Sequence, residues 1–261
     1  MLRWLLTLLG LPGARPKAIP EALWQHTLRR YPFLASRSAA ELQQLRLLVG
    51  QFLQRKEFTG AHGLAVTDEM AVAIAAQACL PVLHLGLAWY DDFTGIVVHP
   101  GAMLARRERT DHAGVVHHYK EALLGEAMHG GPVTLSWQDV ASAGALAGPG
   151  YNVVIHEFVH KIDMKDGAVD GCPPLPSRAA HKAWHAVMQP AYDAFREQVT
   201  MAERFGGEPP WLDAYGATAP AEFFAVSCEA YFVNRERVTQ DFAALTALFD
   251  QFFKSNRPPA L

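Results

Sequence analysis

The chain has 261 residues, and half of them are hydrophobic, which is enough to bury a sizeable core in one large domain or two small ones. Its formal net charge is −3, so no overall positive field favours direct binding to nucleic acid. The three cysteines are scattered and outside any Cys-x-x-Cys motif, which indicates a reducing compartment and a cytoplasmic location. Of these, Cys172 in the segment Gly-Cys-Pro-Pro is the one expected to be exposed.

The N-terminus begins with an apolar run over residues 1–11 that is too short to span a bilayer. It weakly resembles the core of a signal peptide, but no convincing cleavage site follows, and a short docking or membrane-surface helix is an equal alternative. A second apolar run, over residues 71–87, is interrupted by Gln77, Pro81 and His84. We therefore expect no transmembrane span.

The first half of the chain is expected to contain helices followed by a small sheet. The helices are expected at residues 21–31, 38–57 and 67–79, and short strands at residues 83–90, 94–99 and 133–137. Ser38 with Glu41 fits a capping box. The mixed-charge cluster Arg106-Arg107-Glu108-Arg109 is interpreted as a solvated loop or helix face.

The segment His156-Glu157-Phe-Val-His160 follows this sheet and carries the strongest chemical signal. Residues four apart share one face of a helix, so the two imidazoles can bind one metal ion, and Glu157 can reach a water in the open coordination position. Asn152 is a plausible N-cap for this helix after the breakers Gly148-Pro149-Gly150. The pattern predicts a hydrolytic zinc site.

The residues around this motif are apolar on nearly all sides of the predicted helix. Such a helix should be buried, and buried polar side chains need partners because unpaired ones cost about 1–3 kcal/mol each. A metal would satisfy them. The alternative is a surface helix whose histidines and glutamate face water.

The last third of the chain is expected to be helical, with helices near residues 178–204 and 238–253 and an apolar helix that begins around Thr218 and Pro220. His181 and His185 repeat the spacing of four residues but lack a glutamate after the first histidine, so we interpret them as surface residues. The order of helices, a small sheet and more helices predicts the α+β class.

Glu222 lies in the first turn of the apolar helix. It is either a third metal ligand or an acidic residue favoured by the helix dipole. Asp163 lies seven residues after His156, and Glu229 lies seven after Glu222. Each acid is placed either to accept a hydrogen bond from a metal-bound imidazole or to face solvent as a charge.

Four blocks of sequence resemble the MtfA (Mlc titration factor A) family of bacterial zinc metallopeptidases. These blocks are residues 80–90, 131–137, 150–167 and 215–224, and the resemblance extends from about Glu41 to about Phe253. The catalytic core of the family is similar to the protease domain of anthrax lethal factor. The resemblance implies a mainly helical zincin-type (gluzincin) domain, here at residues 21–255, between an N-terminal segment (1–20) and a C-terminal tail (256–261).

The resemblance also implies a role for individual residues. His156, His160 and Glu222 correspond to zinc ligands, Glu157 to the general base, and Tyr215 to a tyrosine that helps to stabilise the oxyanion. Without the resemblance, Tyr215 would be interpreted as a loop residue that packs at a helix entrance. The resemblance implies His117 as a fourth ligand in a closed, inhibited state, whereas the sequence alone makes the pair His117-His118 a surface feature.

We therefore expect a zinc-dependent peptidase, aminopeptidase-like, with one Zn²⁺ per chain and a peptide or protein substrate. An edge strand at residues 131–137 would pair with the extended substrate, unless this strand is internal. The family also implies binding to the transcriptional repressor Mlc or an analogue, which regulates genes for sugar phosphotransfer. The alternative is a non-catalytic regulatory zinc protein that sequesters such a repressor.

Overall fold

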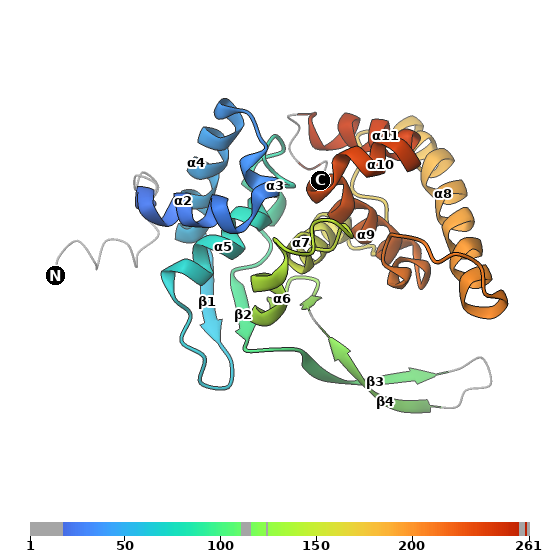
Figure 1. Ribbon diagram of the computed structural model, residues 1–261, viewed down its shortest axis with the longest axis horizontal. Helices are drawn as coiled ribbons and strands as arrows, with labels where there is room; N and C mark the ends of the chain where they lie inside the picture. Colours follow the sequence, from blue (N-terminus) through green and yellow to red (C-terminus); the bar gives the residue numbers. More distant parts are fainter. Residues whose placement is uncertain (1–17, 111–115, 124, 256–258, 260–261) are drawn as a thin grey trace.

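The computed structural model describes residues 18–110, 116–123, 125–255 and 259, with side chains described outside residues 103–124 (Figure 1). The predictions made for residues 1–17 and for most of the tail therefore lie outside the described residues. No helix in the described part of the chain is long and apolar enough to cross a membrane.

The N-terminal helices agree with the sequence. They are α2 (Glu21–Arg30), α3 (Pro32–Ala35), α4 (Ala39–Arg55) and α5 (Asp68–Cys79). The predicted capping box begins α4: the Glu41 N–H donates to the Ser38 hydroxyl at 3.3 Å, and the Ser38 N–H donates to the Glu41 carboxylate at 3.0 Å. Thr67 caps α5 through the N–H of Met70.

A four-stranded mixed sheet lies below these helices in Figure 1, in the order β1-β2-β6-β5. Its strands are β1 (Glu57–Gly60), β2 (Gly95–His99), β5 (Gly125–Ala127) and β6 (Val133–Ser136). The strands β1, β2 and β6 are parallel, and β5 is antiparallel to β6. A separate two-stranded sheet joins β3 (Met103–Thr110) to β4 (Val116–Leu123).

The predicted strands at 94–99 and 133–137 are confirmed, but two other predictions are wrong. Residues 83–90 form turns and a 3₁₀ helix (Leu87–Tyr90), because Gly86 adopts a φ of 84° and Tyr90 is anchored by its hydroxyl to the carbonyl of Ala78. This apolar run is therefore a buried connecting segment and not a strand. The mixed-charge cluster lies on β3 and is neither a loop nor a helix face.

The expected role of residues 131–137 as the sheet edge is also wrong. The strand β6 pairs with β2 on one side and with β5 on the other, so it is internal. The edge next to it is β5, a strand of only three residues. A substrate that pairs with this side of the sheet would therefore meet β5.

The helix that carries the histidine motif, α7 (Val153–Asp163), occupies the middle of the fold (Figure 1). Asn152 caps it as predicted, with its side chain accepting the N–H of Ile155 at 2.9 Å. The helix packs against α5, the sheet and α9 (Pro220–Val233). It is buried nearly all round, so the predicted surface alternative does not apply.

The remaining helices are α6 (Trp137–Ser142), α8 (Arg178–Phe205), α10 (Arg235–Asp241) and α11 (Ala243–Phe253), with 3₁₀ turns at Met164–Asp166 and Ala214–Ala217. The helix expected at 178–204 is confirmed. The single helix expected at 238–253 is two helices, since Phe242 leaves the helical conformation with φ −134° and ψ 55°. Figure 1 shows α8 to α11 on the opposite side of α7 from α2, α4 and α5.

The three cysteines are unpaired and all are buried. The expectation that Cys172 is exposed is wrong, since only 3% of it is accessible. Its loop is held under α8 by the indole N–H of Trp184, which donates to the carbonyl of Gly171 at 2.8 Å.

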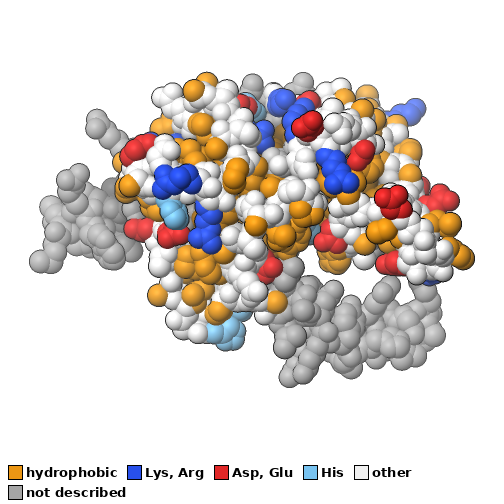
Figure 2. All heavy atoms as spheres, in the orientation of Figure 1, with side chains coloured by type: hydrophobic (Ala, Val, Ile, Leu, Met, Phe, Trp, Pro, Cys, Tyr) orange, Lys and Arg blue, Asp and Glu red, His pale blue; other side chains and the backbone are white. Residues whose placement is uncertain are grey.

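The architecture confirms the mainly helical α+β class with a small mixed sheet. One buried hydrophobic cluster includes side chains from Ile19 to Phe253. On the face drawn in Figure 2, the basic and acidic side chains of the described residues are interspersed, with hydrophobic side chains between them.

The aromatic side chain of Phe158 packs α7 against the rest of the core. Phe158 is fully buried, and its ring centroid lies 5.7 Å from that of Phe52 and 5.1 Å from that of Tyr90. We predict that Phe158→Ala lowers the free energy of unfolding by about 3–5 kcal/mol, as expected for truncation of a buried aromatic residue. Chemical denaturation followed by circular dichroism measures this loss.

Leu47→Ala on α4 is the control, because this side chain is 54% exposed. It should change the free energy of unfolding by about 0.5 kcal/mol or less. A cost for Phe158→Ala as small as that of the control would contradict the packing described here.

Candidate metal centre

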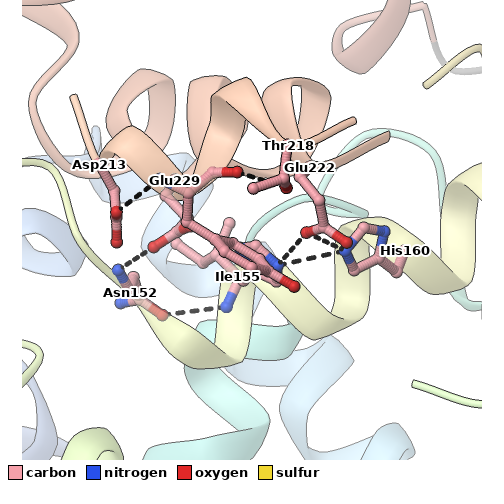
Figure 3. Close-up of polar contacts among 9 residues, drawn as sticks. Asn152, Ile155, His160, Asp213, Thr218, Glu222 and Glu229 are labelled. Atoms are coloured by element: carbon pink, nitrogen blue, oxygen red, sulfur yellow. Dashed lines mark hydrogen bonds and ion pairs between the residues drawn. The ribbon is translucent and has the colours of Figure 1, made fainter. Parts of the chain in front are cut away.

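Three ligand-type atoms from α7 and α9 converge at one point (Figure 3). The Nε2 atoms of His156 and His160 lie 3.1 Å apart. Oε2 of Glu222 lies 3.1 Å from Nε2 of His156 and 3.2 Å from Nε2 of His160. The structure thus brings together the three residues for which the sequence predicted a shared ion.

The dimensions of this triangle suit a metal. Ligand atoms at about 2.0–2.2 Å from a tetrahedral zinc ion lie about 3.3 Å from one another. Hydrogen bonds alone satisfy the three atoms poorly, because two imidazole nitrogens face each other across the triangle. Two imidazoles and one carboxylate are a donor set that a divalent transition metal accepts. The residues present therefore fit a metal ion.

Glu229 orients the first histidine. Its Oε1 accepts a hydrogen bond from Nδ1 of His156 at 2.7 Å, and its Oε2 accepts the backbone N–H of Asn152. With a proton on Nδ1, a neutral His156 presents the lone pair of Nε2 to the centre of the triangle. The amide of Asn152 donates in turn to Gln77 of α5 at 2.8 Å.

Of the two acids left open by the sequence, Glu229 therefore contacts an imidazole, whereas Asp163 has another partner. The carboxylate of Asp163 accepts the backbone N–H of Gly171 at 2.9 Å, which fixes the loop after α7. Burial raises the pKa of Asp163 to about 7. Burial likewise raises the pKa of Glu229, although its hydrogen bond to His156 opposes the shift.

Glu222 lies in the first turn of α9, where the helix dipole favours a negative charge. Burial disfavours its ionised form, but the hydrogen bonds from His156 and His160 outweigh burial and hold the pKa of Glu222 well below its usual value. The two interpretations of this residue are thus compatible. It remains an anion at the helix start and aims that charge at both histidines.

Glu157 lies beside the triangle and is only 5% exposed. Burial raises its pKa to about 8, and the negative charges of Glu222 and Glu229 act in the same direction. Its carboxyl group packs against the backbone of Gly125 on β5. A Cβ atom at Gly125 would lie 2.4 Å from Oε1 of Glu157, so a larger residue there would displace either this side chain or the strand.

The strand β5 is tied to α7 by a lysine that the sequence did not single out. Lys161 is fully buried, and its ammonium group donates to the carbonyls of Met128 and Gly131 in the turn after β5. Burial lowers the pKa of Lys161. This side chain holds the edge strand beside the histidine motif on the same helix.

A cavity of about 500 Å³ opens over these groups. The metal-ligand candidates and Glu157 line its floor, and Gly125, Glu126 and Ala127 of β5 line one wall. The other lining residues come from the turn after β5, the start of α7, the segment after α7, the segment before α9 and α9 itself. The cavity places an extended edge strand and the triangle of ligand atoms within one space.

Tyr215 lies in the segment before α9 and lines this cavity. It is 43% exposed, and its ring centroid is 6.1 Å from that of His156. The backbone N–H of Tyr215 donates to Asp213 at 2.9 Å, which fixes the turn. The tyrosine is therefore at the cavity and is not confined to packing at the helix entrance.

His117 lies on β4, paired with Arg109 of β3. The side chains of this strand lie outside the described residues, so its role as a fourth ligand stays a prediction. The edge strand β5 and Lys161 are the parts of the site that the sequence did not indicate. Neither is part of a recognisable sequence motif. Their role in the site depends on the fold, which places β5 beside α7.

Comparison with known proteins gives a family match over most of the chain. A model of the family described as glucose-regulated metallo-peptidase M90 matches residues 13–254. The chain is 36% identical over 243 residues to Mlc titration factor A of Serratia proteamaculans (strain 568), covering 93% of this chain and 90% of the relative. It is 32% identical over 257 residues to Mlc titration factor A of Yersinia pestis (strain Pestoides F), and this match covers 98% of this chain and 91% of the relative.

These matches span nearly the whole chain and confirm the resemblance found in the sequence. The family description also agrees with a metal-dependent peptidase. The chain therefore belongs to the glucose-regulated metallo-peptidase M90 family.

Proposed function

We propose that this metallopeptidase is zinc-dependent and that His156, His160 and Glu222 are its metal ligands. The observation that carries the proposal is the triangle of ligand atoms with edges of 3.1–3.2 Å. When bound, the metal supplies Lewis acidity that polarises a peptide carbonyl and makes water a stronger acid. Glu229 holds His156 in the tautomer that ligation needs.

Glu157 is the proposed general base. Glu157 lines the cavity, follows His156 directly in sequence, and is shielded from bulk solvent. It takes a proton from the attacking water and then delivers it to the leaving amine. The hydroxyl of Tyr215 donates a hydrogen bond to the carbonyl oxygen as negative charge develops there.

The strand β5 is the proposed substrate-binding edge. An extended peptide can add to a sheet edge through backbone hydrogen bonds, with its side chains in adjacent pockets. The only edge of the described sheet that borders the cavity is β5. Glu126 and Asp213 also line the cavity, and their negative charge favours a substrate with a free amino terminus, which supports aminopeptidase-like cleavage.

A second function is supported by the name that the relatives carry. Since they are called Mlc titration factor A, we also propose that this chain binds the repressor Mlc or an analogue. This role requires a protein surface and not the cavity, so the two functions are compatible. A cytoplasmic location would suit both, and it fits the three unpaired cysteines.

The central test of catalysis is Glu157→Gln, which keeps the shape of the side chain and removes the base. We expect unchanged metal content and a fall in peptide hydrolysis by a factor of about 100 to 10,000, the usual contribution of a general base. Elemental analysis and peptide cleavage, measured side by side, give both quantities. A variant that retains more than about a tenth of the wild-type rate would exclude Glu157 from this role.

The close approach of β5 to Glu157 gives a second test. Gly125→Ala places a methyl group 2.4 Å from the Glu157 carboxyl, so either this group or the strand must move. We expect hydrolysis to fall about tenfold or more, since a displacement near 1 Å in an active site has effects of up to about a hundredfold. Steady-state cleavage of a peptide measures this change.

The matched control is Gly148→Ala. Gly148 is exposed, and no atom lies within 4 Å of a Cβ built there, so this variant should keep the wild-type rate. Full activity of Gly125→Ala would show that β5 and Glu157 are not in the contact described here.

A further inference from the structure

A second group of ligand-type side chains lies outside the cavity, where the loop after α7 meets α8. Cys172 belongs to the loop, and His181 and His185 are one turn apart on α8. One ligand atom from each of the three residues lies within 4.8 Å of the others. The sequence indicated only surface histidines here, because the cysteine joins them through the fold.

The distance between the sulfur of Cys172 and the ring of His181 suits a metal ion. The Sγ atom of Cys172 lies 3.5 Å from Nδ1 of His181. A tetrahedral zinc ion, with sulfur at about 2.3 Å and nitrogen at about 2.0–2.1 Å, holds two such ligands about 3.6 Å apart. A thiol–imidazole hydrogen bond would explain this pair alone. It does not explain why a ligand atom of His185 also lies within 4.8 Å of the other two.

The loop holds Cys172 in this position without help from a metal. The residue before it, Gly171, has a φ of 81° and donates its N–H to Asp163 at the end of α7. The carbonyl of Gly171 accepts the indole N–H of Trp184 on α8. The N–H of Cys172 itself donates to the carboxylate of Asp170 at 3.0 Å. The sulfur is therefore preorganised beside the two histidines.

We propose that Cys172, His181 and His185 form a second transition-metal site, in addition to the proposed peptidase centre. A thiolate and two imidazoles select a borderline-soft ion such as Zn²⁺ over Mg²⁺ or Ca²⁺. Binding displaces the thiol proton to solvent, and the carboxylate of Asp170 adds negative charge nearby that favours a cation. Three protein ligands leave the fourth position to water on the exposed side of His185.

The location gives the ion a structural consequence. Gly171 packs against the start of α9 so closely that a Cβ atom there would lie 2.6 Å from the carbonyl oxygen of Pro220, two residues before Glu222. Val169 of the same loop lines the cavity. An ion that joins Cys172 to α8 would brace this loop between the two sites.

Cobalt substitution of the full chain tests the proposal, because a thiolate ligand gives Co²⁺ a charge-transfer absorption in the near ultraviolet. The proposed peptidase centre contains no sulfur, so this band reports the second site alone. We expect the metal-free protein to bind two Co²⁺ per chain and to develop the band. Cys172→Ser and His185→Ala should each abolish the band and remove one Co²⁺.

His185 is exposed, so His185→Ala tests the site even if Cys172→Ser fails to fold. Two further variants serve as controls. The first, His26→Ala, removes another exposed imidazole and should keep both ions and the band. His156→Ala should lose one Co²⁺ and keep the band. One Co²⁺ per chain without the band in the wild-type protein would overturn the second site alone. Retention of two ions and the band in His156→Ala would instead contradict the peptidase centre.

Discussion

The burial of α7 is the constraint on which the rest of the structure depends. This helix presents a hydrophobic surface nearly all round, yet it also carries two histidines, a glutamate, a lysine and an aspartate. Each buried polar group costs about 1–3 kcal/mol unless it finds a partner. The neighbouring elements supply partners to four of these five side chains: α9 supplies Glu222 and Glu229 to the histidines, the turn after β5 supplies carbonyls to Lys161, and the loop after α7 supplies an N–H to Asp163.

The same contacts place the chemistry. Because Glu222 and Glu229 are two turns apart on α9, one helix both completes the triangle of ligand atoms and orients His156. Lys161 is next to His160 in sequence but donates to the turn after β5, so the helix that carries the candidate ligands also positions the edge strand. The polar side chains of α7 and the wall of the cavity are thus parts of one arrangement, and the proposed metal site depends on the partners that this buried helix finds.

Much of this site could be predicted from local sequence. The Asn152 cap, the spacing of His156 and His160, and the interval of seven residues between Glu222 and Glu229 are properties of single helices, and the structure reproduces each one. The edge strand could not be predicted in this way. Residues 125–127 are too short to show alternation, and whether β6 is internal depends on which strand pairs with it.

The other errors have the same origin. The run at 83–90 is apolar because both of its sides are buried, and Gly86 with a positive φ turns it away from an extended conformation. Cys172 looked exposed in a loop rich in proline, but Trp184 lies 12 residues later in sequence and covers that loop from α8. In each case the sequence defines the local preference, and contacts between distant segments decide the outcome.

The most direct test of the account is a crystal structure of the zinc-loaded protein with anomalous diffraction recorded on both sides of the zinc absorption edge. The account predicts an anomalous peak at the centre of the triangle formed by Nε2 of His156, Nε2 of His160 and the carboxylate of Glu222. A well-ordered triangle of these residues without a zinc peak between them, in crystals grown with the metal, would contradict it.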